Sequence, residues 1–397
     1  MTYAGTNKGG TAAIVAAEKL VEAQRGGREA PDVATVIACF GASIDRVMGE
    51  AGLWDEPTAA SAFVQAAGDP AEAVHLLRAH RSTLPRLAVS MPVDARDMQI
   101  LRRIVPAHRS PHGPQLLGAT VDYTARILRG PAGEDPLPIV DDITHQEPSE
   151  VPDAPFQRYS DFLRERGLLV EHEADRDAEP VDLALTPPRL PAARSALLSA
   201  MALGETGGLV NLWYRSILGP DGYADESVTL GEVRHGRVEI KVRHPHTGNP
   251  MSIGAIRVSE TETIAHLDER GEDPSRFEMG YGMALGHNER KTIAMSSIDL
   301  AATRYRGTAE GDSLQQLIML TTDGLASNGF LEHLKLPHYV TFRSMMDRAE
   351  AARAEQTANP TRQQRVVGQE QEARTVHATR DRDDISALII QKVGHSA

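Results

Sequence analysis

Hydrophobic side chains recur at helical spacing in the first part of the chain. The segment PDVATVIACFGASIDRVMG places six of them on one helix face, namely Val33, Val36, Ile37, Phe40, Ile44 and Val47. The run GDPAEAVHLLRAHR predicts a second helix, in which Asp69 caps the start, Pro70 suits the first turn and Glu72 completes a capping box. Pro85 stops that helix. These patterns predict a helical N-terminal region over residues 1–130.

Alternation typical of strands appears only in the middle of the chain. Val238, Ile240 and Val242 alternate with polar residues in RVEIKVR, and RHG before them suggests a hairpin turn after ESVTLGEV. HPHTGNP predicts the next turn, and MSIGAIRV and SETETI predict further strands. GYGMALGHNERK suggests a glycine-rich loop running into a helix, and QQLIMLTTDG suggests a short strand.

The expected fold is α+β, with a helical N-terminal region, a central antiparallel β region, C-terminal helices and a mobile tail. Residues 131–180 hold fourteen acids and four arginines among many prolines, which favours a linker or surface excursion with one helix at FQRYSDFLRERGLL. The mixed α/β region would cover residues 181–343, starting with a helix near ARSALLSAMAL. Residues 344–397 would form a charged helix and a flexible tail.

Composition narrows the class of protein. The formal charge of −13 argues against a nucleic-acid binder, and no apolar run is long enough for a membrane span. The start of the chain lacks the pattern of a secretion signal, and the single cysteine, Cys39, suits a reducing cytoplasm. We therefore expect a cytoplasmic protein with no nucleic-acid or membrane partner.

Two histidines in HLKLPHYV, His333 and His338, are candidate metal ligands. Pro337 disfavours a regular helix through them, so a turn would have to bring the rings together. Neutral imidazole suits zinc or iron, but a tetrahedral site needs three or four ligands. Either the remaining ligands come from elsewhere, or one ring is packed and the other solvated.

A local surplus of positive charge suggests an anion site. Residues 75–112 hold seven arginines, two aspartates and four histidines. We hypothesise that some of its arginines hold phosphates, because guanidinium groups match phosphate oxygens in pairs; the candidates are Arg78, Arg81, Arg102 and Arg103. Arg290 and Lys291, at the expected helix start, are further candidates. The alternative is a solvated face with scattered ion pairs.

Glu260 and Glu262 stand two apart in SETETI, so that both side chains would face one side of a strand. Paired carboxylates can serve chemistry at an anomeric carbon, where one stabilises positive charge and one moves protons. The alternative is a charged, solvated sheet face. Asp122 in VDYT is a third carboxylate candidate, with helix capping as its alternative role.

Taken in order, these segments resemble the PhnI family, a subunit of the bacterial carbon–phosphorus lyase core complex. The resemblance is carried by KGGTAAI, DRVMGEAGL, AAGDPAEAVHLLRAHRSTLPRLAVSMP, QLLGATVDYT, TPPRLPAARS, GEVRHG, GYGMALGHNERKTIAM and GFLEHLKLPHYVTF, over roughly residues 8–343. It departs at Met279, where relatives often have arginine, and at Ala125, where a histidine occurs in relatives.

The resemblance implies a reaction that depends on partner subunits. With them, the subunit would displace the adenine of magnesium ATP with an alkylphosphonate, giving ribose 1-phosphonate 5-triphosphate. Alone, it would act as a purine nucleoside triphosphate nucleosidase. The implied partners are the PhnG, PhnH and PhnJ types of core subunit and associated ATP-binding-cassette subunits. His333 and His338 would bind zinc or iron together with the radical S-adenosylmethionine subunit, and a scaffold that only presents this half-site is the alternative function.

Overall fold

The computed structural model describes residues 10–24, 26–27, 29–120, 156–170, 179–187, 189–218, 229–266, 275–334 and 339–358. The chain divides into two compact units. One comprises Met1–Arg28 and Glu332–Ala397, and its described part holds α1 (Gly10–Gln24) and α10 (Tyr339–Ala358). The other, Glu29–Leu331, contains the sheet, helices α2 to α8 and α9 up to Leu331. The tail expected after α10 lies outside the described residues.

Helices α2 (Val33–Ala51), α3 (Glu56–Gln65) and α4 (Pro70–Thr83) pack around one hydrophobic core. Asp69 caps α4 as predicted, since its side chain accepts hydrogen bonds from the amides of Ala71 and Glu72. Val36, Ile44 and Val47 of the predicted stripe are buried. Phe40 is half exposed; the backbone of α2 kinks at that residue, and the centroid of its ring lies 5.8 Å from that of Phe63 in the core.

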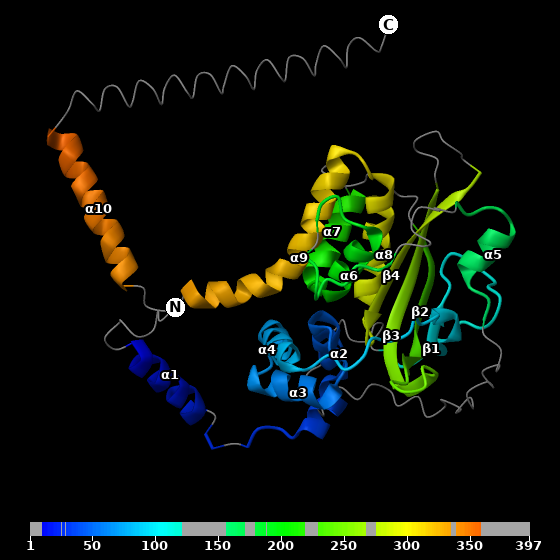
Figure 1. Ribbon diagram of the computed structural model, residues 1–397, viewed down its shortest axis with the longest axis horizontal. Helices are drawn as coiled ribbons and strands as arrows, with labels where there is room; N and C mark the ends of the chain where they lie inside the picture. Colours follow the sequence, from blue (N-terminus) through cyan, green and yellow to red (C-terminus); the bar gives the residue numbers. More distant parts are fainter. Residues whose placement is uncertain are drawn as a thin grey trace, which may run out of the picture. The chain divides into compact units, whose positions relative to one another are not determined.

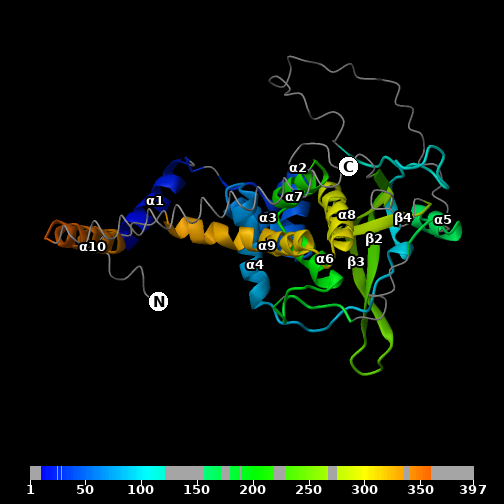
Figure 2. The same cartoon turned by 90° about the horizontal axis from the view of Figure 1, so that it is seen from above.

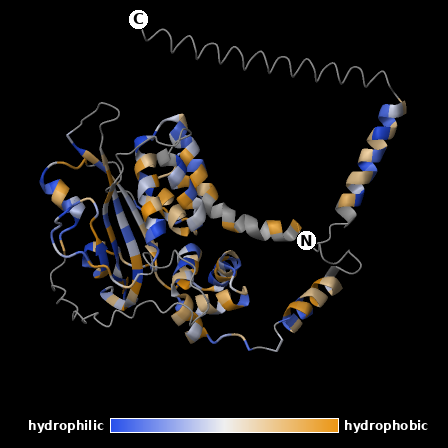
Figure 3. Ribbon diagram, turned by 180° about the vertical axis from the view of Figure 1, so that it is seen from behind, coloured by the Kyte–Doolittle hydropathy of each residue, from blue (hydrophilic) through white to orange (hydrophobic). Residues whose placement is uncertain are grey.

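Four antiparallel strands form one sheet in the order β1-β2-β3-β4, which confirms the α+β class. The strands are β1 (Gln99–Ile104), β2 (Thr229–Arg243), β3 (Pro250–His266) and β4 (Phe277–Leu285). Figures 1 and 2 show helices on both sides of it. α6 (Arg194–Leu203), α7 (Thr206–Leu218) and α8 (Glu289–Arg304) lie on one side, and α5 (Tyr159–Glu165) lies on the other. In Figure 3 the hydrophobic positions gather on the packed helices, while the strands carry many hydrophilic ones.

The hairpin turn expected at RHG is wrong. β2 continues through these residues without a break, and the chain turns only at the predicted second turn, where the His244 amide bonds the Asn249 carbonyl. Gly236 is needed for another reason: a side chain there would overlap the Gln99 carbonyl oxygen of β1. The glycine therefore permits close approach of a neighbouring strand rather than a turn.

The glycine-rich loop expected at GYGMAL is also wrong, because these residues form β4. A side chain at Gly280 would overlap the Ser296 carbonyl oxygen of α8, and one at Gly282 would overlap the Thr292 carbonyl oxygen. The two glycines allow α8 to lie directly on the sheet, and the predicted helix does follow them. The face beneath α8 is polar but paired, since Thr261 bonds Thr292 at 2.7 Å.

In three further segments the observed structure differs from the one predicted from the sequence. QQLIMLTTDG is helical, within α9 (Ala309–Leu334), because Leu314 and Ile318 are buried at a spacing of four. β1 lies in the region expected to be entirely helical. Part of the expected linker, residues 156–170, belongs to the folded unit: α5 forms as predicted, and the amide of Phe277 bonds the carbonyl of Leu168.

Candidate active site

The sheet face that α5 covers carries a buried network of charges. Glu232 and Arg234 on β2 are register partners of Glu262 and Glu260 on β3. Glu260 and Glu262 face the same side, as their spacing predicted, but they are only 2 % and 3 % exposed. The alternative of a charged, solvated sheet face is therefore wrong. Burying a carboxylate costs free energy unless it is paired, so both side chains need partners.

Arg158, at the start of α5, binds both carboxylates. Its Nη2 lies 2.7 Å from Glu260 Oε1 and its Nη1 lies 3.3 Å from Glu262 Oε1. Glu260 also accepts hydrogen bonds from Arg234, at 3.0 Å, and from the Tyr281 hydroxyl, at 2.8 Å. Glu260 is therefore paired with three donors.

Glu262 has fewer partners. The Ser160 hydroxyl donates to its Oε1 at 2.9 Å, whereas its buried Oε2 has no hydrogen-bond partner among the described residues. Burial raises the pKa of Glu262 to about 7, although the charge of Arg158 opposes this rise. A carboxyl group with a pKa near neutrality can take up and release protons under physiological conditions.

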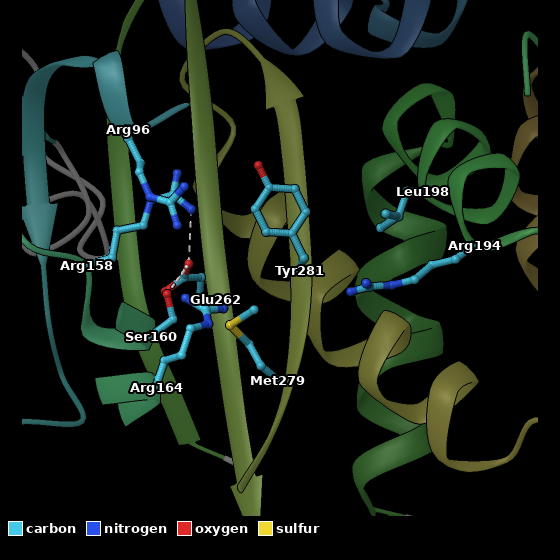
Figure 4. Close-up of a pocket in the computed structure, with 9 residues that line it drawn as sticks. All are labelled: Arg96, Arg158, Ser160, Arg164, Arg194, Leu198, Glu262, Met279 and Tyr281. Carbon is cyan, nitrogen blue, oxygen red and sulfur yellow. Dashed lines mark hydrogen bonds and ion pairs between the residues drawn. The ribbon is translucent and has the colours of Figure 1, made fainter. Parts of the chain in front are cut away.

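A cavity of about 160 Å³ opens beside Glu262, and Figure 4 shows the side chains that line it. Four arginines reach it from three parts of the chain: Arg96, Arg158, Arg164 and Arg194. Ser160, Glu262, Tyr281, Met279 and Leu198 complete the lining. Glu260 does not line the cavity, so the structure separates the two carboxylates: Glu262 faces the space, and Glu260 lies behind Arg158.

The predicted phosphate ligands Arg78 and Arg81 lie elsewhere, at the C-terminal end of α2. Arg78 donates to the carbonyls of Glu50 and Leu203, and Arg81 donates to the carbonyl of Ala51 at 2.7 Å. These bonds satisfy carbonyls that a helix end leaves unpaired. Both guanidinium groups thus link helices, and their binding of phosphate stays a prediction.

Arg102 and Arg103 are buried in the sheet. Arg102 binds Glu289 at 2.6 Å, on the side of α8. Arg103 binds Glu232 at 2.7 Å on the opposite side and donates to the carbonyls of His112 and Gln157. The neighbours therefore point to opposite faces, as strand geometry requires, and the structure does not bring them to one phosphate-sized space.

Arg290 is exposed at the start of α8, whereas Lys291 is only 1 % exposed and donates to the Ala202 carbonyl. Burial lowers the pKa of Lys291 to about 7, and the nearby charge of Glu50 opposes this. Lys291 is therefore a buried amine at the contact between α8 and α6, outside the cavity beside Glu262.

Lys291→Met is expected to change how stability depends on pH. The amine binds more protons in the unfolded chain, with a pKa of 10.5, than in the folded one, with a pKa of about 7. Between about pH 7 and the unfolded pKa of 10.5, the free energy of unfolding of the parent chain should thus rise. The rise should exceed that of the variant by more than about 1.4 kcal/mol. Urea titrations at several pH values measure this; parallel curves for the two proteins would contradict it.

The remaining predicted residues cannot be placed in this site. Asp122 and His338 lie outside the described residues, and His333 lies in α9 with its side chain likewise outside them. Within the described part of the chain, no group of three or more His, Cys, Asp and Glu side chains could hold a metal ion. The shared metal site at His333 and His338 stays a prediction.

A second polar cluster was missed from the sequence. The rings of His235 and His287 stack with centroids 4.3 Å apart, and His287 Nε2 lies 3.5 Å from Glu289. Burial, with the charge of His287, lowers the pKa of His235 to about 4, so this ring is neutral at neutral pH. Two separate motifs supply its members: GEVRHG contains His235, and LGHNER contains His287 and Glu289 at the start of α8.

Comparison with known proteins decides the family. The model of the family described as "Bacterial phosphonate metabolism protein (PhnI)" matches residues 4–356. The chain belongs to the PhnI family. The match confirms the resemblance drawn from the ordered motifs. In the structure, the motif GYGMALGHNERK forms part of β4 and the start of α8. None of the described helices of this PhnI protein is both long and apolar enough to cross a bilayer.

Curated relatives of this PhnI chain match over nearly their whole lengths. A Rhizobium meliloti protein named alpha-D-ribose 1-methylphosphonate 5-triphosphate synthase subunit PhnI is 38 % identical over 88 % of this chain and 95 % of its own. The Escherichia coli protein of the same name is 36 % identical over 88 % of this chain and 98 % of its own. A Stutzerimonas stutzeri protein named putative C-P lyase subunit protein HtxH is 36 % identical over 90 % of this chain and 97 % of its own.

Proposed function

We propose that this chain is a subunit of a ribose 1-methylphosphonate 5-triphosphate synthase in phosphonate breakdown. With its partner subunits it displaces the adenine of magnesium ATP with an alkylphosphonate, and alone it hydrolyses purine nucleoside triphosphates to ribose 5-triphosphate and base. The names of two relatives that match along almost their full lengths support the synthase role.

The observation that carries the chemistry is the unequal pair of buried carboxyl groups beside an arginine-lined cavity. Glu262 takes a proton from the attacking water or phosphonate, whose oxygen forms a bond to the anomeric carbon. The electron pair of the glycosidic bond leaves with adenine, which takes up a proton from solvent, and Glu262 then releases its proton to solvent. Glu260 does not line the cavity, and it acts by positioning Arg158 and Tyr281.

The proposal includes an assembly with PhnG-, PhnH- and PhnJ-type core subunits and with ATP-binding-cassette subunits. The C-P lyase name of one relative supports assembly in general terms. His333 and His338 would provide half of a zinc or iron site that a partner completes.

The test is an adenine-release assay with magnesium ATP, on the purified chain and on the co-expressed complex, with and without methylphosphonate. We expect slow adenine release by the chain alone, and in the complex a new phosphonate ester detected by phosphorus NMR. Absence of adenine release from both preparations would overturn the proposal. Release by the complex alone, at equal rates for the parent protein and Glu262→Gln, would instead identify the chain as a scaffold.

A further inference from the structure

The cavity beside Glu262 gathers more donors than its carboxyl groups use. The two terminal nitrogens of Arg158 donate to Glu260 and Glu262. Its Nε is buried without a hydrogen-bond partner among the described residues. A buried donor without a partner is destabilising, so the site favours a bound acceptor such as an anion.

The carboxylates that balance the other arginines lie outside the cavity lining. Asp161 binds Arg96 at 3.1 Å and Arg164 at 2.6 Å, and Asp299 binds Arg194 at 2.6 Å. Glu262 is the carboxyl group among the nine residues that line the space. The inner surface is thus rich in guanidinium groups, which suit tetrahedral oxyanions.

Size limits the ligand. Pockets for complete cofactors or drug-sized molecules run from about 300 to 1,000 Å³, whereas this cavity holds about 160 Å³. It therefore fits one phosphoryl or phosphonyl group with a small substituent, and a whole nucleotide would have to lie mostly outside it.

Two apolar side chains complete the lining on the side away from Arg158. Met279 projects from β4 beneath Tyr281, and Leu198 projects from α6 beside Arg194, as Figure 4 shows. An inorganic phosphate has no apolar part to place there, whereas an alkylphosphonate joins a tetrahedral anion to a hydrocarbon group.

We propose that this cavity is the binding site for the alkylphosphonate nucleophile, with Arg158 and Arg194 on the oxygens and Met279 and Leu198 on the alkyl group. The unpartnered Oε2 of Glu262 accepts the acidic proton of a phosphonate monoanion. The assignment rests on the proposed function, to which it adds the residues that hold the second substrate.

Binding by the full chain is measured by calorimetry and phosphorus NMR with methylphosphonate, inorganic phosphate and sulfate. We expect methylphosphonate to bind most tightly. Phosphate should bind several-fold more weakly because it lacks the alkyl group, and sulfate should bind weakest because it also lacks the proton that Glu262 accepts. Equal affinity for all three anions, or no binding of methylphosphonate, would overturn the assignment.

Variants locate the site. Arg194→Gln should weaken methylphosphonate binding about tenfold or more, whereas Arg86→Gln, which removes an exposed partner of Asp182 outside the cavity, should not. Met279→Ala enlarges the space, so propylphosphonate should gain affinity relative to methylphosphonate, a change that misfolding cannot produce. Unaltered affinities in both cavity variants would refute the site. These measurements detect methylphosphonate binding without turnover. If adenine release persists in a protein that does not bind methylphosphonate in this cavity, the assignment of the cavity fails and the proposed function stands.

Discussion

Glu262→Gln is expected to lower adenine release from magnesium ATP by about 10²–10⁴-fold, the usual contribution of a general base. Glutamine has nearly the same shape and keeps an oxygen for the Ser160 hydroxyl, but it cannot take a proton. The affinity for ATP should change little. Steady-state kinetics with adenine quantified by chromatography measure both parameters.

The pH profile separates a proton-transfer role from a structural one. Since the pKa of Glu262 is raised to about 7, its ionised fraction grows as the pH rises. Adenine release by the parent chain should therefore increase from about pH 5 to about pH 8 and then level off, and the variant should lack this rise. Glu278→Gln is the matched control, because it alters a buried carboxylate paired with Arg304 away from the cavity. A parent-like rate and profile in Glu262→Gln would rule out the base.

Gly280→Ala is expected to reduce the free energy of unfolding by about 3 kcal/mol, at the upper end of the usual cost of overpacking. The added methyl group would overlap the Ser296 carbonyl oxygen and lie 2.8 Å from Leu300, so β4 and α8 would have to separate. Adenine release should fall as well, because β4 carries Tyr281.

Urea denaturation followed by circular dichroism measures this loss as a lower midpoint. Gly41→Ala is a suitable control: this glycine lies in α2, and an added methyl group meets nothing within 4 Å. Alanine there should raise stability by about 0.5–1 kcal/mol through helix propensity alone. Equal midpoints for the parent chain and Gly280→Ala would show that the sheet and α8 do not pack as described.

Local patterns in the sequence predicted those elements whose signals are themselves local. The Asp69 cap, the helix at ARSALLSAMAL and the shared face of Glu260 and Glu262 depend on residues within one turn or one strand. The glycines at positions 236, 280 and 282 misled because their purpose is close contact with segments far away in the chain. A turn and a tight contact require the same residue, and sequence alone does not distinguish them.

The candidate site shows the same limit. The basic region 75–112 suggested phosphate ligands, yet Arg102 and Arg103 point to opposite faces and bind carboxylates of distant strands. Two arginines that do line the cavity lie elsewhere in the sequence. Arg158 belongs to the strongly acidic segment 131–180, and Arg194 is the first residue of α6. Charge counted along the chain could not find them, because tertiary folding decides which charges meet.

The bonds of Arg103 join parts of the chain that lie far apart in the sequence. One guanidinium group holds the carbonyls of His112 and Pro114 on one side and of Gln157 on the other. Arg103 also binds Glu232 of β2, so one side chain of β1 contacts β2 and both of these segments. Lysine could not replace this residue, because one ammonium group lacks the planar fork of donors that reaches these separate segments at once.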